Sequence, residues 1–81
     1  MEKEDILKTL SRVISNVLNV NNLKLNYNMS AKDIDGWTSL TNMQIISEIE
    51  KEFNIRFKLR DIIKMHSLDD MCNEIKNKLQ Q

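Results

Sequence analysis

The sequence predicts an all-α fold, a small four-helix bundle of three longer helices and one short helix with a long first loop. Apolar residues recur at steps of three and four along three stretches of the chain, which is the pattern of helices that bury one face. Only four of the 81 residues are aromatic, so the core must be built mainly from Leu, Ile, Val and Met, which suits packed helices better than aromatic-rich strands. We find no repeat or linker and expect a single domain spanning residues 1–81.

The first helix is expected from about Lys3 to Val20. Acidic residues at its start suit the positive end of the helix dipole. The helix should stop near residues 19–22, because asparagine tolerates left-handed backbone and competes with helical hydrogen bonds. Its apolar face is formed by Ile6, Leu7, Leu10, Val13, Ile14, Val17 and Leu18.

Residues 21–36 form a long connection in which apolar residues alternate, a pattern that is formally that of a strand. The alternating residues are Leu23, Leu25, Tyr27 and Met29. No partner strand is evident, so we interpret the segment as an irregular loop that is held in place by those side chains. A loop of this length in a small domain is expected where it fills the core or has a function. Gly36, the only glycine, lies at its end.

A second helix is predicted from Ser39 to Phe53. Its apolar positions, again at helical spacing, are Leu40, Met43, Ile45, Ile46, Ile49 and Phe53. Asn54 then breaks the pattern, and alternation through Ile55 and Phe57 to Leu59 predicts an extended connector.

Two further helices complete the prediction. A short helical turn is expected at about Leu59 to Met65. Ser67 followed by Asp70 resembles a capping box with Asp in place of the usual Glu, which marks the start of a last helix. The apolar face of this helix is Leu68, Met71, Cys72, Ile75 and Leu79, and lysines near its end suit the negative end of the dipole.

Charge and composition limit the possible functions. Twelve basic and twelve acidic side chains cancel, so there is no general attraction to nucleic acid or to anionic membranes. The single cysteine cannot form an internal disulfide, which fits a reducing compartment. There is no long apolar run and no signal-like N-terminus, so we expect a cytoplasmic protein with no membrane insertion.

Neither catalysis nor metal binding is supported. His66 has no nucleophile near it in the sequence, and we expect a solvent-exposed histidine between helices. Cys72 is expected to be a small buried hydrophobe. A calcium loop starting at Asp33 would place glycine too early and Gln44 at the position that requires glutamate. We therefore expect no enzyme, no catalytic residue and no metal site.

Ser39 is notable for its position at the start of the second helix. A side chain there projects from the helix end, where backbone N–H groups and the dipole create positive potential that favours a phosphate. The alternative is simple helix capping, which Thr38 or Ser39 could supply.

Several features together resemble the acyl carrier protein family over essentially the whole chain. They are the length, the long first loop, Trp-x-Ser-Leu at residues 37–40, the closing segment at residues 49–55, and the short third and capped fourth helices. In that family the serine of an Asp-Ser-Leu motif carries 4′-phosphopantetheine, and Ser39 matches it. The resemblance implies that a phosphopantetheinyl transferase moves the arm from coenzyme A with Mg²⁺, and that the thiol of the arm carries acyl or aminoacyl groups as thioesters for partner enzymes.

Partners of this family commonly dock on the exposed side of the second helix. The matching positions are Leu40, Thr41, Met43, Gln44, Ser47 and Glu48. The alternative is that these are ordinary surface residues, with Leu40 or Met43 partly in the core.

The chain departs from the family pattern in two ways. Thr38 replaces the aspartate that normally precedes the serine, which removes a carboxylate that could help the metal or attract a basic transferase. The chain is also neutral where typical members are strongly acidic, so steering to a basic partner should be weaker and the partner set narrower. The Gly-Trp-x-Ser-Leu form favours a specialised carrier of a polyketide, peptide or surface-polymer pathway over one of fatty-acid synthesis.

Two alternatives to a modified, monomeric carrier stay open. One is a carrier-like helical interaction module that is never modified. The other is a helix-turn-helix DNA binder that uses the basic segment Arg56–Lys64, although no basic recognition helix of useful length is evident and four cations more often form a solvated face.

Overall fold

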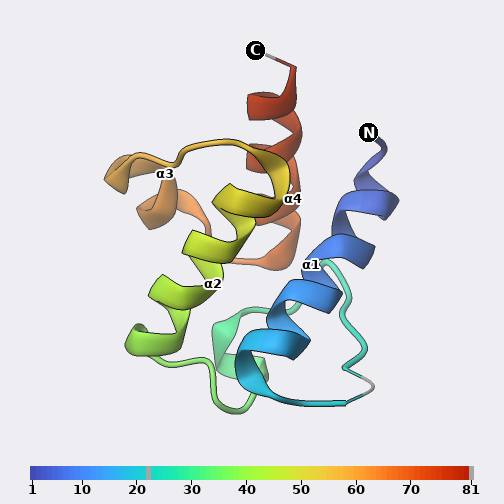
Figure 1. Ribbon diagram of the computed structural model, residues 1–81, viewed down its shortest axis with the longest axis vertical. Helices are drawn as coiled ribbons and strands as arrows, with labels where there is room; N and C mark the ends of the chain where they lie inside the picture. Colours follow the sequence, from blue (N-terminus) through green and yellow to red (C-terminus); the bar gives the residue numbers. More distant parts are fainter. Residues whose placement is uncertain (22, 81) are drawn as a thin grey trace.

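The computed structural model describes residues 1–21 and 23–80. Within them the prediction of an all-α fold with three longer helices and one short helix is confirmed (Figure 1). The elements in chain order are α1 (Lys3–Leu18), the 3-10 turn η1 (Ala31–Asp33), α2 (Ser39–Phe53), α3 (Leu59–Lys64) and α4 (Leu68–Leu79). The predicted bounds of α2 agree with the structure, while α1 ends two residues and α3 one residue earlier than expected. None of the helices described is long and apolar enough to span a lipid bilayer.

Helix α1 packs against both α2 and α4, and α3 lies on the opposite side of α2 from α1 (Figure 1). Both chain ends lie at the top of this view. The long first loop rises beside α1, returns through η1 to the lower end of the bundle and leads into the start of α2 there. Ser39 therefore opens α2 at the end of the bundle opposite the two termini.

The core is aliphatic, as the composition predicts. It combines residues from α1, α2 and α4 with one residue that follows η1. Its buried members are Ile6, Leu10, Val13, Ile14, Ile34, Ile45, Ile46, Ile49, Phe53, Leu68, Met71, Cys72 and Ile75. The expected burial of Cys72 is confirmed, and burial raises the pKa of its thiol to about 11, so the thiol stays protonated and unreactive near neutral pH.

The first loop is irregular, as predicted, and backbone hydrogen bonds fix it to α4. The N–H groups of Leu68 and Asp69 donate to the carbonyl oxygens of Met29 and Tyr27, at 2.8 and 3.0 Å. The loop thus satisfies N–H groups in the first turn of α4 that have no partner inside the helix. The alternating apolar side chains at 23–29 are half-buried against the core, and no strand forms among the described loop residues. Asn22, part of the predicted loop and of the predicted stop of the first helix, lies outside the described residues.

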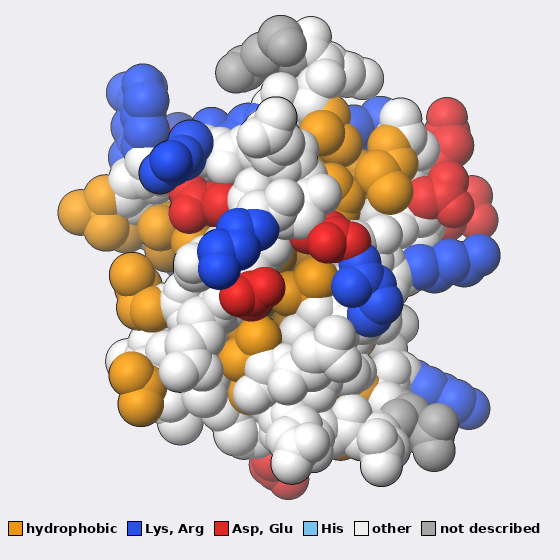
Figure 2. Space-filling view, viewed as in Figure 1, with side chains coloured by type: hydrophobic (Ala, Val, Ile, Leu, Met, Phe, Trp, Pro, Cys, Tyr) orange, Lys and Arg blue, Asp and Glu red, His pale blue; other side chains and the backbone are white. Residues whose placement is uncertain are grey.

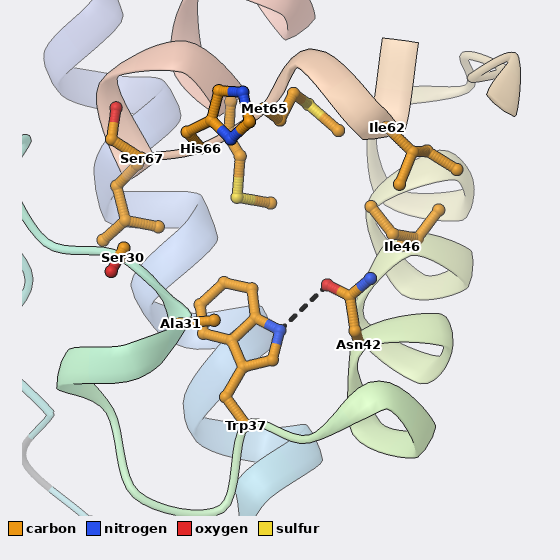
Figure 3. A pocket seen from close by; sticks show the side chains of 11 residues that line it. Ser30, Ala31, Trp37, Asn42, Ile46, Ile62, Met65, His66 and Ser67 are labelled. Carbon is orange, nitrogen blue, oxygen red and sulfur yellow. Dashed lines mark hydrogen bonds between the residues drawn. The ribbon is translucent and has the colours of Figure 1, made fainter. Parts of the chain in front are cut away.

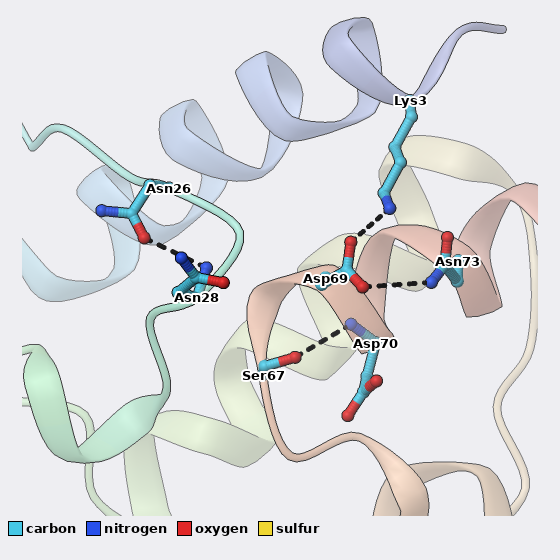
Figure 4. Close-up of polar contacts among 7 residues, drawn as sticks. All are labelled: Lys3, Asn26, Asn28, Ser67, Asp69, Asp70 and Asn73. Atoms are coloured by element: carbon cyan, nitrogen blue, oxygen red, sulfur yellow. Dashed lines mark hydrogen bonds and ion pairs between the residues drawn. The ribbon is translucent and has the colours of Figure 1, made fainter.

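An ion pair joins the start of α1 to the first turn of α4. Lys3 pairs with Asp69 (Figure 4). The Lys3 Nζ also lies 4.8 Å from the centre of the Tyr27 ring. The hydrogen bond to Asp69 raises the pKa of Lys3. The start of α1, the loop and the start of α4 therefore meet at one polar cluster on the surface.

Of the two hydrogen bonds that the predicted capping box requires at the start of α4, the structure contains one. The Oγ of Ser67 accepts a hydrogen bond from the N–H of Asp70 at 3.2 Å, as expected (Figure 4). The reciprocal bond differs, because the Asp70 carboxylate accepts from the N–H of His66 at 2.9 Å and not from that of Ser67. The turn before the helix places the earlier N–H within reach of this side chain, so the capping-box prediction is wrong in its second half.

Both α1 and α2 end at an asparagine in the left-handed conformation. Asn19 and Asn54 have φ values of 56° and 55°, which confirms the predicted stop signals. A residue with a Cβ and no compensating side chain is disfavoured there by about 1–2 kcal/mol. We predict that Asn54→Ala lowers the free energy of unfolding by about 1 kcal/mol, whereas Asn54→Gly keeps it. Urea unfolding measures both. Asn77→Ala, at an exposed position inside α4, is the matched control and should not destabilise.

Candidate functional site

The start of α2 is shaped by a turn and a network of two threonines. Gly36 has φ of 88°, a conformation that side chains other than glycine rarely adopt. Thr38 is the N-cap residue, and its Oγ1 accepts from the N–H of Thr41 at 3.3 Å. The Thr41 hydroxyl accepts from the N–H of Thr38 and donates to the carbonyl of Gly36, each at 2.7 Å. These bonds fix the direction in which the chain enters α2.

Thr38, and not Ser39, therefore supplies the helix cap. Ser39 is the first residue of the helix and is exposed, and its hydroxyl makes no hydrogen bond to any other described residue. Of the two roles that the sequence left open for Ser39, capping is excluded by the structure. The hydroxyl remains accessible for modification.

The electrostatic setting of Ser39 favours a phosphate. The first N–H groups of a helix have no acceptor within it, and the dipole places positive potential at this end. The first turn of α2 contains no acidic residue that would neutralise that potential. A phosphate on the Ser39 oxygen would lie beside these N–H groups.

A cavity of about 80 Å³ lies next to this helix end. It is partly open to solvent and is bordered by the first loop, α2, α3 and the start of α4 (Figure 3). Its wall is Ser30, Ala31, Trp37, Asn42, Ile46, Ile62, Met65, His66, Ser67, Leu68 and Met71. A shallower hollow that includes Thr38 and Ser39 shares Ala31, Trp37, Asn42 and Met65 with the cavity, so Ser39 borders a hollow that adjoins the cavity.

A hydrogen bond between Trp37 and Asn42 crosses one side of this cavity. The indole N–H of Trp37 donates to Oδ1 of Asn42 at 2.9 Å (Figure 3). Sequence reasoning missed this pair, because a five-residue spacing across a helix start follows no periodic pattern. His66 is exposed between α3 and α4 as predicted, and it also borders the cavity.

The predicted docking residues on α2 fall into two groups. Leu40 and Met43 are 72% and 61% exposed, so the alternative that either is partly in the core is wrong. At 100° per residue these two positions point away from the buried stripe that contains Ile45 and Ile49, and Ser47 shares their exposed face.

Of the other three docking candidates, Thr41 and Glu48 form contacts within the molecule. Gln44 is exposed. Thr41 is half-buried and its hydroxyl is engaged in the cap described above. Glu48 is exposed and pairs with Lys51 at 3.6 Å. The structure therefore presents Leu40, Met43 and Ser47 together, with Gln44 and Glu48 on the adjoining face.

Two comparisons with known proteins agree with this arrangement. The family model described as "Phosphopantetheine attachment site" matches residues 8–75. The solution NMR structure of a holo acyl carrier protein from Geobacter metallireducens is similar to this chain with a TM-score of 0.86 and 30% sequence identity. The match covers 91% of this chain and 85% of that one.

Proposed function

Because the chain belongs to the family of phosphopantetheine attachment domains, we propose that Ser39 is the residue that carries its 4′-phosphopantetheine arm. The chain is a phosphopantetheine carrier protein and not an enzyme. The observation that supports Ser39 most directly is its exposed hydroxyl at the first position of α2, where it takes no part in the helix cap. Thr38 performs the structural role that would otherwise occupy this serine.

Attachment needs a phosphopantetheinyl transferase with Mg²⁺. The Ser39 hydroxyl oxygen attacks the phosphorus that bears the pantetheine, the phosphoanhydride bond of coenzyme A breaks, and adenosine 3′,5′-bisphosphate leaves. The hydroxyl proton passes to a base on the transferase. The N–H groups and dipole of α2 stabilise the phosphodiester charge on the carrier. The thiol of the bound arm then holds a cargo as a thioester, and partner enzymes perform the loading and transfer.

The sequence pattern supports a proposal for the class of cargo and of pathway. We propose a monomeric cytoplasmic carrier, one domain over residues 1–81, for acyl or aminoacyl groups. The Gly-Trp-x-Ser-Leu form favours a polyketide, peptide or surface-polymer pathway over fatty-acid synthesis. Leu40, Met43 and Ser47 form the centre of its docking helix, with Thr41, Gln44 and Glu48 beside them.

Intact mass spectrometry tests the attachment. After incubation with coenzyme A, Mg²⁺ and a broad-specificity transferase, the chain should gain the mass of one phosphopantetheine, located by fragmentation on the peptide that contains Ser39. An unchanged mass would favour the carrier-like interaction module that is never modified.

Thr38→Asp should accelerate the transfer. It restores a carboxylate beside the modified serine, and Asp caps a helix as well as Thr does. We expect the initial rate to rise roughly fivefold, equivalent to about 1 kcal/mol from one exposed charged contact. Timed mass spectra measure this rate.

Thr38→Asn is the matched control, because it caps the helix without adding charge. The rate of transfer to this variant should stay near that of the chain with Thr38. An equal acceleration by Asn and Asp would assign the effect to cap geometry and contradict the role of the carboxylate.

A further inference from the structure

Four large apolar side chains are exposed on neighbouring parts of α2 and α3. Leu40 and Met43 of α2 are 72% and 61% exposed, and Leu59 and Ile63 of α3 are 73% and 63% exposed. We refer to these four residues as the α2–α3 face. The other large apolar side chains that are exposed in the described residues are Met1, Val20 and Leu79, which lie near the ends of α1 and α4 and not on α2 or α3. Figure 2 shows hydrophobic side chains along the left edge of the molecule, where Figure 1 places α2 and α3.

Helical geometry groups these side chains. Leu40 and Met43 are three residues apart, and Leu59 and Ile63 are four apart, so each pair lies on one side of its helix. Scattered single apolar residues are normal on a surface, whereas several large ones gathered on one side of the molecule, as Figure 2 shows along its left edge, indicate an interaction surface. The position of Leu40 directly after Ser39 places this face beside the proposed attachment site.

The charge that borders the α2–α3 face on α3 is positive. Arg60 and Lys64, also four residues apart, form the adjoining row of α3, and both are exposed. Neither forms an ion pair with another described residue. The only acid of α3, Asp61, points inward, where it pairs with Lys78 at 3.0 Å and accepts the Lys58 N–H at 2.8 Å. These bonds lower the pKa of Asp61, so it stays ionised and engaged.

The acids of α2 are also engaged within the molecule. Glu48 pairs with Lys51, and Glu52 pairs with Arg12. Glu50 accepts the N–H of Phe57 at 2.8 Å. The part of α2 that carries Leu40 and Met43, residues 39–44, contains no charged side chain. A chain with zero net charge therefore presents a locally positive border on the α3 side of this apolar face.

We propose that the α2–α3 face docks a partner enzyme through an apolar patch that is bordered by Asp and Glu side chains. Charge complementarity points to acidic side chains on the partner, because Arg60 and Lys64 are exposed and form no ion pair with another described residue, whereas the acids of α2 and α3 already have partners within this chain. The inference rests on the proposed function, since a partner seated here would meet the arm on Ser39. An anionic membrane fits less well, because α3 has only six residues and the chain lacks the net positive charge that draws proteins to such surfaces.

Two labelled helical peptides provide the test. Both carry the same leucine face, one flanked by glutamates and the other by lysines, and fluorescence anisotropy measures their binding to the unmodified protein at low salt. The acidic peptide should bind roughly tenfold more tightly than the basic one, which is the combined size of two exposed charge contacts, and the preference should shrink as salt is added.

Charge reversal shows where the preference arises. Arg60→Glu with Lys64→Glu should invert it, whereas Lys8→Glu with Lys24→Glu, which makes the same change in net charge at exposed positions on α1 and the first loop, should leave it intact. Leu59→Ser with Ile63→Ser should abolish binding of both peptides. Circular dichroism and the unfolding midpoint establish that each variant is folded.

Three results would overturn the proposal. They are no binding of the acidic peptide, an equal loss of preference in both charge-reversed variants, or binding to phosphatidylserine vesicles that disappears in the Arg60/Lys64 variant, which would identify a membrane surface. Because the peptide assay does not need the arm, failure here is distinct from failure of Ser39 to be modified, which the mass measurement reports.

Discussion

Ser39→Ala is expected to abolish phosphopantetheine transfer completely. The substitution removes the only atom proposed to bond to the phosphorus, so no residual rate should remain. The fold should be unaffected, because Ser39 is exposed, does not cap α2 and makes no hydrogen bond to the other described residues. Alanine is also the best helix former at a helical position. The intact mass should therefore stay that of the unmodified chain, with an unchanged circular dichroism spectrum.

Ser47→Ala is the matched control for this experiment. Ser47 is also exposed on α2 and lies two turns further along the same face. Its replacement should leave the mass shift in place. If Ser39→Ala still acquired one arm, another hydroxyl would be the acceptor and the attachment proposal would be wrong. If Ser47→Ala alone lost the arm, the acceptor would be on the docking face and not at the helix start.

Local rules were sufficient to predict the helices. The spacing of apolar residues located the three longer helices. The asparagines at 19 and 54 mark the ends of α1 and α2, because their left-handed backbone is a local property. The prediction that residues 21–36 form an irregular loop is confirmed for the described residues, but the contacts that hold this loop in place are tertiary. Met29 and Tyr27 are fixed by the N–H groups of α4, which lie some forty residues away in sequence.

The candidate site could be predicted only in part. Ser39 was proposed from its motif and stays a prediction, but the helical pattern did not decide which apolar residues of α2 are buried. Leu40 and Met43 fit the helical spacing as well as Ile46 does, yet α1 covers only the other side of the helix. In the same way, Arg60 looks partly neutralised by Asp61 in sequence. The structure turns Asp61 toward Lys78 on α4, a contact that no local pattern encodes.

The largest stability effect is expected from Ile49→Ala. Ile49 is fully buried on the face of α2 that meets the core. Truncating such a side chain costs about 2–5 kcal/mol, because the lost burial adds to the cavity that remains. A domain of this size has a total stability of roughly 4–12 kcal/mol, so much of it would be lost. A loss of about 3 kcal/mol would lower the melting temperature by about 12–24 °C, which calorimetry can measure.

Ile63→Ala makes the same chemical change at a position that is 63% exposed. Its cost should stay within about 0.5 kcal/mol, because little burial is lost at the surface. The two isoleucines thus separate the core from the α2–α3 face. If Ile63→Ala were as destabilising as Ile49→Ala, this face would have to be covered in solution, by a second copy of the chain for example. A small effect on stability with weaker peptide binding would instead agree with an exposed docking surface, because Ile63 would then contribute only to the complex.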